Sequence, residues 1–367
     1  MRLTIDSDYM KMALDLAQRA KGQTSPNPIV GAVIVRNNKI IAEGYHRRCG
    51  ADHAEVVALK KAGKSAKGAK LYVTLEPCSH FGRTPPCVDR IIQSGIEEVN
   101  VGMIDPNPVN NGKSILKLKH ARIKTKVGFL KEELQKANES FIKFIRYRIP
   151  FVVVKSAQTI DGKIATALGQ SKWITSKQSR NYAHHLRNDF DAILVGIGTV
   201  LKDNPRLNAT KKSKRIKKII LDTTLRIPLQ AQLFKNTIPS DIIVATTEKM
   251  KKDKYLLLKK KGVDTIICPP SYDGVDLSWL LKKLAQKEIT NILVEGGSKI
   301  IGSLLKENLV DKFLIFIAPK IMGDERAINS VRGLTLNNIN RLVRLKNLTF
   351  QKIGDDILIE GYVYRNH

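Results

Sequence analysis

Hydrophobic and polar residues along this chain follow two spacings, one typical of helices and the other typical of buried strands. Residues 8–20 carry apolar side chains three and four positions apart, which predicts an amphipathic helix. Residues 29–35 are a β-branched run that predicts a buried strand, and residues 40–45 predict its hairpin partner across a turn at 36–39. Strands and helices alternate from there, so the pattern indicates a layered α/β domain. The other elements expected in it are a helix at 53–62, a strand at 70–75, a helix at 87–94, a strand at 98–103 and a helix at 132–148.

The length of the chain and one proline indicate two domains. The 367 residues exceed what a single hydrophobic core usually serves. Pro150 ends the charged helix at 132–148, and the apolar run at 151–154 begins a new buried strand. We therefore predict one domain at residues 1–149 and another at residues 150–367.

The second half also alternates strands with helices, and two of its buried strands run into glycine-containing turns. These turns are Gly196–Thr199, after a strand at 192–195, and Glu295–Gly302, after a strand at 291–294. Glycines let a backbone approach a phosphate closely, and a glycine turn that opens a helix suits a dinucleotide pyrophosphate. The G-x-G-x-x-G fingerprint is absent, so an ordinary Rossmann site is not indicated. Further expected elements are a strand from 151 with a turn near 161, a helix at 176–187, and strands at 217–221, 241–245, 309–318 and 356–364.

Composition adds a large positive charge, because 63 Lys and Arg against 34 Asp and Glu give a formal net charge of +29. Nucleic acid, a membrane surface and anionic small molecules would all be attracted to it. The excess is spread over both halves without a basic arm, so a Lys-rich composition explains it at least as well as a nucleic-acid groove. No apolar run approaches the roughly 20 residues of a membrane span, and no signal-peptide core is present, so we expect a cytoplasmic protein.

The strongest chemical signal is the set His53, Glu55, Cys78 and Cys87. One imidazole and two thiolates can hold zinc tetrahedrally and leave the fourth position for a water. Glu55 lies two residues from a ligand, where it can transfer protons without binding the metal. An H-x-E motif followed by Pro-Cys and a second Cys is typical of zinc nucleobase deaminases, although the cysteines here are more widely spaced than the usual C-x-x-C. The sequence therefore predicts a zinc deaminase.

Two polar residues near this set are candidate substrate contacts. Asn27 lies on the loop before a strand, where it could bind a base or a ribose, but an Asx turn before Pro28 explains it equally well. His80 lies inside the loop between the two cysteines, where a spare imidazole could reach a substrate. His46 is a weaker candidate of the same kind.

The segments Ser25–Gly31, His53–Glu55 and Pro77–Cys87 resemble the deaminase domain of the bifunctional riboflavin-biosynthesis deaminase/reductase family. The wide cysteine spacing with Gly-Arg-Thr-Pro-Pro separates this family from cytidine and tRNA-adenosine deaminases, which are similar in fold. The resemblance implies a cytidine-deaminase-like three-layer α/β/α domain. It also implies that His53, Cys78 and Cys87 are the zinc ligands and that Glu55 is the proton donor.

The second half resembles the reductase domain of the same family, whose α/β fold is similar to dihydrofolate reductase. The matching segments are 155–163, 171–175, 187, 191–199, 203–205 and 295–297. The resemblance implies NADPH contacts at Ala157, Trp173, Thr199, Asp203, Gly297, Ser298, Lys299, Ile300 and Ile301. It implies substrate contacts at Ser171, Arg187, Leu207 and Glu295, with Lys155 and Asp161 nearby. A planar guanidinium such as Arg187 can grip a ribose phosphate with two hydrogen bonds.

One position departs from the family pattern, in which an Arg ends the motif that begins at Asp203. Here Thr210 stands at that place. Either Arg206 or Arg215 replaces the missing cation, or the substrate phosphate is bound more weakly. The Lys-rich segment 211–218 is a candidate for the 2′-phosphate of NADPH, although a solvated basic loop is the simpler interpretation.

We predict a bifunctional riboflavin-biosynthesis enzyme that uses zinc and NADPH. It would deaminate 2,5-diamino-6-ribosylamino-4(3H)-pyrimidinone 5′-phosphate and then reduce the ribosyl chain to ribityl. Its partner would be this small molecule, with no nucleic acid and no membrane, and a homo-oligomer is compatible with the sequence. The alternatives are a tRNA-type nucleic-acid deaminase with an accessory binding domain and a non-catalytic protein with a structural zinc.

Overall fold

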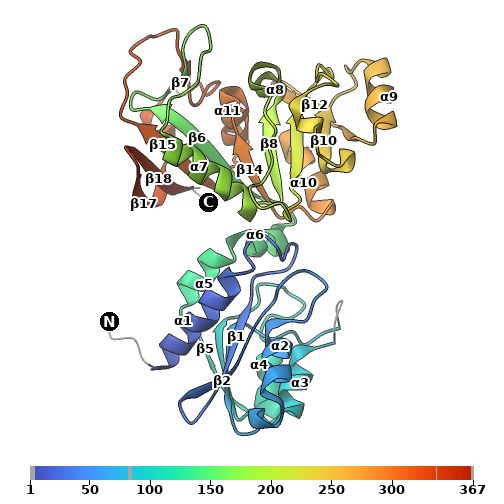
Figure 1. Cartoon of the computed structure of the whole chain (residues 1–367), viewed down its shortest axis with the longest axis vertical. Helices are drawn as coiled ribbons and strands as arrows, with labels where there is room; N and C mark the ends of the chain where they lie inside the picture. Colours follow the sequence, from blue (N-terminus) through green and yellow to red (C-terminus); the bar gives the residue numbers. More distant parts are fainter. Residues whose placement is uncertain (1–4, 82–84, 336, 365–367) are drawn as a thin grey trace. The chain divides into compact units, whose positions relative to one another are not determined.

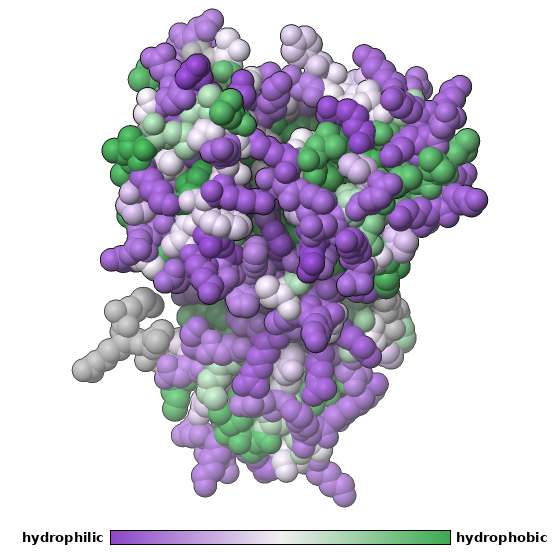
Figure 2. Space-filling view, turned by 45° about the horizontal axis from the view of Figure 1, so that its top comes forward, coloured by the Kyte–Doolittle hydropathy of each residue, from purple (hydrophilic) through white to green (hydrophobic). Residues whose placement is uncertain are grey.

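The chain divides into two compact units, Met1–Arg148 and Ile149–His367, as seen in a computed structural model (Figure 1). The structure describes residues 5–81, 85–335 and 337–364. No helix in these ranges is long and apolar enough to cross a lipid bilayer. Figure 2 shows one face covered largely by hydrophilic side chains, with hydrophobic residues in scattered patches.

The first unit is built on a five-stranded sheet with the strand order β2-β1-β3-β4-β5. Its strands are β1 Gly31–Arg36, β2 Lys39–Tyr45, β3 Lys70–Leu75, β4 Glu98–Met103 and β5 Lys124–Val127. Its helices are α1 Ile5–Gln18, α2 Ala54–Ala62, α3 Cys87–Gln93, α4 Lys113–His120, α5 Lys131–Ala137 and α6 Glu139–Tyr147. Strand β1 is antiparallel to β2 and β3, whereas β3, β4 and β5 are parallel.

Helices cover both faces of this sheet, and two glycines show how closely they approach. A Cβ at Gly31 would overlap the backbone carbonyl of Ala13 in α1. A Cβ at Gly44 would overlap that of Ala54 in α2. Gly44 pairs across the strands with Ala32, the neighbour of Gly31, so the two glycines lie on opposite faces. The three-layer architecture implied by the family resemblance is therefore confirmed.

The single helix predicted at residues 132–148 is wrong, because two helices, α5 and α6, meet at Asn138. The Asn138 side chain accepts a hydrogen bond from the backbone N–H of Ile29 and donates one to its carbonyl. This long-range contact fixes Asn138 outside both helices, and no local pattern signals it. Helix α4 and strand β5 were not predicted from the sequence.

The second unit is built on a nine-stranded sheet with the order β11-β10-β9-β8-β14-β6-β15-β18-β17. Its strands are β6 Phe151–Thr159, β8 Ala192–Gly196, β9 Lys217–Leu221, β10 Ile242–Thr246, β11 Asp264–Ile267, β14 Asn291–Glu295, β15 Lys312–Ala318, β17 Leu345–Ile353 and β18 Asp356–Val363. Two small sheets pair β7 Lys163–Ala165 with β16 Ile328–Asn329 and β12 Pro270–Ser271 with β13 Gly274–Val275. Its helices are α7 Lys177–Leu186, α8 Ile197–Asp203, α9 Lys252–Lys260, α10 Leu277–Gln286 and α11 Ser298–Lys306.

The central strands of this sheet are buried on both faces. In β6, Val152 and Val154 belong to one hydrophobic cluster, and Phe151 and Val153 belong to another. Successive side chains of a strand point to opposite faces, so each cluster lies on its own side of the sheet. The parallel strands β6, β14 and β8 are neighbours, which brings their carboxyl ends together at one edge. In parallel α/β sheets this edge is where ligands bind.

Candidate active sites in the two units

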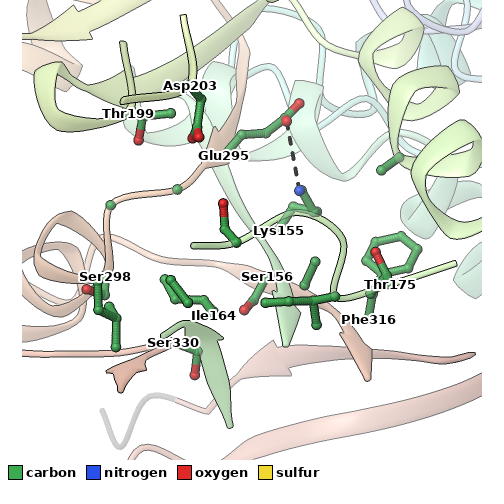
Figure 3. Close-up of a pocket in the computed structure, with 18 of the residues that line it drawn as sticks. Lys155, Ser156, Ile164, Thr175, Thr199, Asp203, Glu295, Ser298, Phe316 and Ser330 are labelled. Carbon is green, nitrogen blue, oxygen red and sulfur yellow. Dashed lines mark ion pairs between the residues drawn. The ribbon is translucent and has the colours of Figure 1, made fainter. Parts of the chain in front are cut away.

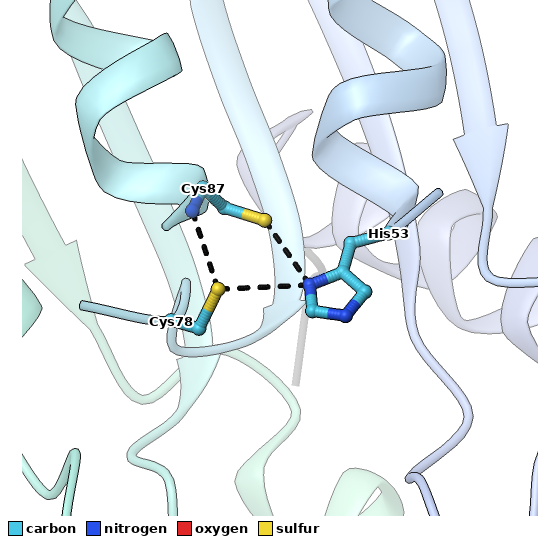
Figure 4. Close-up of side chains that lie close together, drawn as sticks. All are labelled: His53, Cys78 and Cys87. Atoms are coloured by element: carbon cyan, nitrogen blue, oxygen red, sulfur yellow. Dashed lines mark hydrogen bonds between the residues drawn. The ribbon is translucent and has the colours of Figure 1, made fainter. Parts of the chain in front are cut away.

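Three ligand atoms converge in the first unit, as Figure 4 shows. His53 is the N-cap of α2, Cys87 is the first residue of α3, and Cys78 follows β3. His53 Nδ1 lies 3.2 Å from Cys87 Sγ and 3.6 Å from Cys78 Sγ. Tetrahedral zinc with its usual Zn–N and Zn–S bond lengths holds such atoms about 3.6 Å apart. The three side chains therefore fit a zinc ion.

The protonation of these ligands also favours a cation. The thiol of Cys87 donates a hydrogen bond to Cys78, which lowers the pKa of Cys78 to about 4. The same interaction raises the pKa of Cys87. The backbone N–H of Cys87 also donates to Cys78 Sγ over 3.2 Å. The low pKa of Cys78 favours the thiolate form that binds a metal, and a metal would displace the proton of Cys87.

Glu55 lies in the first turn of α2 beside these ligands, and only 3% of its surface is exposed. Burial raises the pKa of its carboxyl to about 7. It interacts with the Cys87 thiol but does not belong to the ligand set. A carboxyl with such a pKa can take up and release a proton near neutral pH.

Two of the candidates predicted from the sequence, Asn27 and His46, lie next to His53 of this ligand set. The side-chain amide of Asn27 lies 3.1 Å from Nε2 of His46, whose Nδ1 lies 3.1 Å from the backbone carbonyl of Asp52. The His46 ring meets the His53 ring edge-on with their centroids 5.3 Å apart. Asn27 is thus held by a side-chain contact as well as by its turn. Nδ1 of His80 is buried without a hydrogen-bond partner among the residues that the structure describes.

Sequence reasoning missed a buried polar network that holds the Cys78 loop. The carboxylate of Glu76 accepts hydrogen bonds from the backbone N–H groups of Asp105, Gly112 and Ser114. Fully buried Asn110 donates to the Pro77 carbonyl and to Asp105, and its oxygen accepts from the backbone and hydroxyl of Ser79. The only local signal was the acidic residue two positions before Cys78. Residues 82–84 of the same loop lie outside the described ranges.

The second unit has a cavity of about 540 Å³ at the carboxyl edge of its sheet (Figure 3). Most of the predicted contacts line it, namely Lys155, Ala157, Ser171, Trp173, Thr199, Asp203, Glu295, Gly297, Ser298 and Ile301. Lys299 and Ile300 line a neighbouring cavity instead. Arg187, Leu207 and Asp161 do not line the larger cavity. Leu207 is buried in the core, and the Asp161 carboxylate accepts hydrogen bonds from the backbone of Met322 and Gly323.

Buried charges stand at the end of β14 beside this cavity. Arg187 donates two hydrogen bonds to the Glu295 carboxylate, over 2.7 and 2.9 Å. Lys155 approaches the same carboxylate at 3.9 Å. Although burial opposes ionisation, the Arg187 charge holds the pKa of Glu295 below its usual value. Arg187 therefore reaches the cavity only through Glu295.

Arg180 was also missed, and it supports a predicted cofactor contact. Its guanidinium carbon lies 4.2 Å from the centroid of the Trp173 ring, within the range of a cation–π contact. It also donates a hydrogen bond to the Thr175 carbonyl. Although 62% of Trp173 is exposed, this stacking orients its ring at the cavity.

Neither arginine suggested as a substitute at the Thr210 departure lines the cavity. Arg206 contacts Gln232, and Arg215 forms a bidentate pair with Asp241. Thr210 itself lies within hydrogen-bond distance of His185 and Asn188. The basic segment 211–218 lines neither the large cavity nor its neighbour.

Two family models match the chain. The model for the cytidine and deoxycytidylate deaminase zinc-binding region matches residues 3–103, and the model for the RibD C-terminal domain matches residues 150–359. The riboflavin biosynthesis protein RibD of Aquifex aeolicus is 46% identical over 357 residues, which cover 97% of this chain and 98% of that protein. RibD of Escherichia coli is 37% identical over 372 residues, which cover 96% of this chain and 98% of that protein.

Solved structures extend this similarity to the whole fold. Acinetobacter baumannii RibD, form 2, superposes with a TM-score of 0.87 at 33% identity, covering 98% of this chain and 99% of that one. A diaminohydroxyphosphoribosylaminopyrimidine deaminase/5-amino-6-(5-phosphoribosylamino)uracil reductase of Thermotoga maritima gives a TM-score of 0.85 at 36% identity, with the same coverage. The two expected folds, similar to cytidine deaminase and dihydrofolate reductase, are confirmed. On these matches, the chain belongs to the RibD family of riboflavin biosynthesis proteins.

Proposed function

We propose that this chain catalyses two reactions of riboflavin biosynthesis, the zinc-dependent deamination of a diaminopyrimidine ribosyl phosphate and the NADPH-dependent reduction of its ribosyl chain. We assign the first reaction to residues 1–149 and the second to residues 150–367. The observation that carries the proposal is the zinc-compatible set of His53, Cys78 and Cys87 with the unligated Glu55 beside it. The partner is then a small molecule, and we expect a cytoplasmic location.

In the deaminase site, His53, Cys78 and Cys87 would hold zinc, which supplies a water acidified to near-neutral pKa. The Glu55 carboxylate takes up a proton at its oxygen and passes it to the amino group that leaves as ammonia. Its burial and its pKa of about 7 suit both halves of this transfer. Asn27 would bind the base or the ribose, and His80 would contact the substrate from the cysteine loop.

In the reductase site, NADPH supplies the hydride that reduces C1′ of the opened sugar. Trp173, Thr199 and Asp203 would contact the cofactor, while Ser171, Lys155 and Glu295 would face the substrate from the same cavity. Arg187 would orient Glu295 through their double hydrogen bond. The substrate contacts at Leu207 and Asp161 stay predictions of the family pattern alone.

Substitution of a zinc ligand tests the assignment of the deamination to the zinc site. The purified chain should contain about one zinc ion, and Cys78→Ser should lose it, because a hydroxyl does not replace a thiolate ligand. Elemental analysis and ammonia release measure the metal and the first reaction. NADPH oxidation with the deaminated pyrimidine measures the second.

The two activities serve as controls for each other. We expect Cys78→Ser to abolish ammonia release while NADPH oxidation stays close to that of the unmodified chain. A chain that is purified without metal and still releases ammonia would disprove the zinc assignment. A chain that binds no NADPH would disprove the reductase assignment.

Asn110→Ala should weaken zinc binding without removing a ligand. The substitution deletes the hydrogen bonds that hold Pro77 and Ser79 on either side of Cys78. Loss of such supporting contacts typically lowers metal affinity about 10- to 100-fold. Competition with a chromogenic chelator measures the affinity, and Asn111→Ala, a change at an exposed position next to Asn110, is the control. Unchanged affinity in Asn110→Ala would show that the cysteine loop holds its shape unaided.

A further inference from the structure

A second cavity of about 390 Å³ adjoins the large one in the second unit. The two cavities share Gly198, Thr199, Gly297, Ser298 and Ile328. The shared rim therefore includes the glycine turn at which α11 begins. Figure 3 shows Thr199 and Ser298, two of these shared residues, bordering the large cavity. A ligand longer than one cavity can thus pass across this rim into the other.

Three cations from separate segments line the second cavity. Arg226 follows β9, Lys299 lies in the first turn of α11, and Arg332 follows β16. Within the described residues, none of these three side chains has an ion pair. Among the described residues that line the cavity, Asp273 is the one with an acidic side chain, and it is already bound by Lys306 at 3.1 Å. The cavity therefore carries uncompensated positive charge and favours an anion.

The backbone of Arg332 packs directly against α11. Its N–H donates a hydrogen bond to the Ser298 carbonyl over 3.1 Å. Its carbonyl lies so close to Gly302 of α11 that a Cβ there would overlap it. The start of α11 and the segment that carries Arg332 thus form one wall of the cavity, and Arg226 approaches from the turn after β9.

The basic segment 211–218 offers no such site. Arg215 and Lys217 are both paired with Asp241, and Lys214 lies 3.9 Å from Asp191. Lys218 is buried, and its ammonium group donates hydrogen bonds to side-chain and backbone oxygens. Since this segment also lines neither cavity, the sequence-based candidate for the 2′-phosphate does not fit the structure.

We propose that Arg226 and Arg332 bind the 2′-phosphate of NADPH in this second cavity and so select NADPH over NADH. This inference rests on the proposed reductase function. The nicotinamide must meet the substrate in the large cavity, and the pyrophosphate suits the glycine turn at the start of α11. The adenosine half then lies in the second cavity, where two guanidinium groups match a phosphate monoester in shape and charge.

The test compares the two dinucleotides in the full-length chain. In the Arg226→Ala/Arg332→Ala double variant, the affinity for NADPH should fall about 10- to 100-fold, the usual effect of losing hydrogen bonds to a charged group. The affinity for NADH should change by less than about threefold, since NADH lacks the phosphate. Competition by 2′,5′-ADP should weaken in parallel, whereas competition by 5′-AMP should not.

Lys211→Ala/Lys212→Ala is the matched control, because it removes two positive charges from the rival segment. It should leave the preference for NADPH unchanged, and ammonia release should stay normal in all variants. The proposal is overturned if the arginine variants weaken NADPH and NADH equally, or if only the lysine variant lowers the preference. It is also overturned if the unmodified chain binds both dinucleotides equally. If that chain binds neither, the reductase function itself fails.

Discussion

Replacing Glu55 with glutamine is expected to slow ammonia release by roughly 10²- to 10⁴-fold, the usual contribution of a general acid–base group. Glutamine preserves the shape of the side chain but cannot take up or deliver the proton. Glu55 does not belong to the ligand set of His53, Cys78 and Cys87, so zinc should remain bound. Ammonia release and elemental analysis of the same preparation measure the two quantities.

Glu97→Gln, a change on the exposed surface of the same unit, is the matched control and should keep full activity. The reductase reaction of the same chain provides a second control and should not change in either variant. Normal ammonia release in Glu55→Gln would remove its assigned role. Loss of zinc together with activity would instead make Glu55 a metal ligand or a support for one.

The ligand set could be predicted from sequence because its spacing is tied to element boundaries. His53 and Cys87 lie at the starts of α2 and α3, and Cys78 lies just after β3. These are the places where loops meet regular structure and side chains converge. The local pattern of strands and helices therefore carries most of the information about this site.

The contacts that hold the ligand set could not be predicted in the same way. The hydrogen bond between Asn110 and Ser79 joins residues 31 positions apart in the sequence, and the one between Asn138 and Ile29 joins residues 109 positions apart. Such hydrogen bonds join loops that only the folded sheet brings together. The same is true of Arg187 and Glu295, which are 108 positions apart. Arg187 and Glu295 were each predicted as site residues, but their pairing was not predicted.

The position of an arginine close to a motif in the sequence did not predict whether that arginine lines a cavity. Arg215 lies five residues after Thr210, yet its guanidinium is held by Asp241. Arg226 and Arg332 are far apart in sequence and line one cavity. Where a cation is used depends on which carboxylates are already beside it, and this is a property of the tertiary fold.

Arg187→Met is expected to destabilise the second unit by about 3–5 kcal/mol, because it leaves a buried carboxylate without its main partner. The side chains of Arg187 and Glu295 are only 13% and 9% exposed. Lys155, at 3.9 Å, offsets part of the loss. Both tryptophans of the chain, Trp173 and Trp279, lie in this unit, so denaturant unfolding followed by tryptophan fluorescence reports its stability selectively.

The double variant Arg187→Met/Glu295→Gln should recover part of that stability, because the buried carboxylate is then gone and only the more distant Lys155, which is 18% exposed, loses its partner. Asp264→Asn is the control, since its partner Lys287 and Asp264 are 44% and 32% exposed and such a pair contributes about 0–1 kcal/mol. A loss of stability in Arg187→Met as small as in this control would show that the buried pair is not stabilising.

The pH dependence of this pair separates its charge from its packing. The pKa of Glu295 in the folded chain lies below its usual value of 4.5, chiefly because of Arg187. A carboxyl with a lowered pKa adds stability that is fully present above the unfolded pKa and is lost as the pH falls through the folded one. The stability difference between the unmodified chain and Glu295→Gln should therefore be constant near neutral pH and shrink below about pH 4.5. A difference that stays the same into the acid range would mean that the contact acts through shape, because the charge of Glu295 would then contribute nothing.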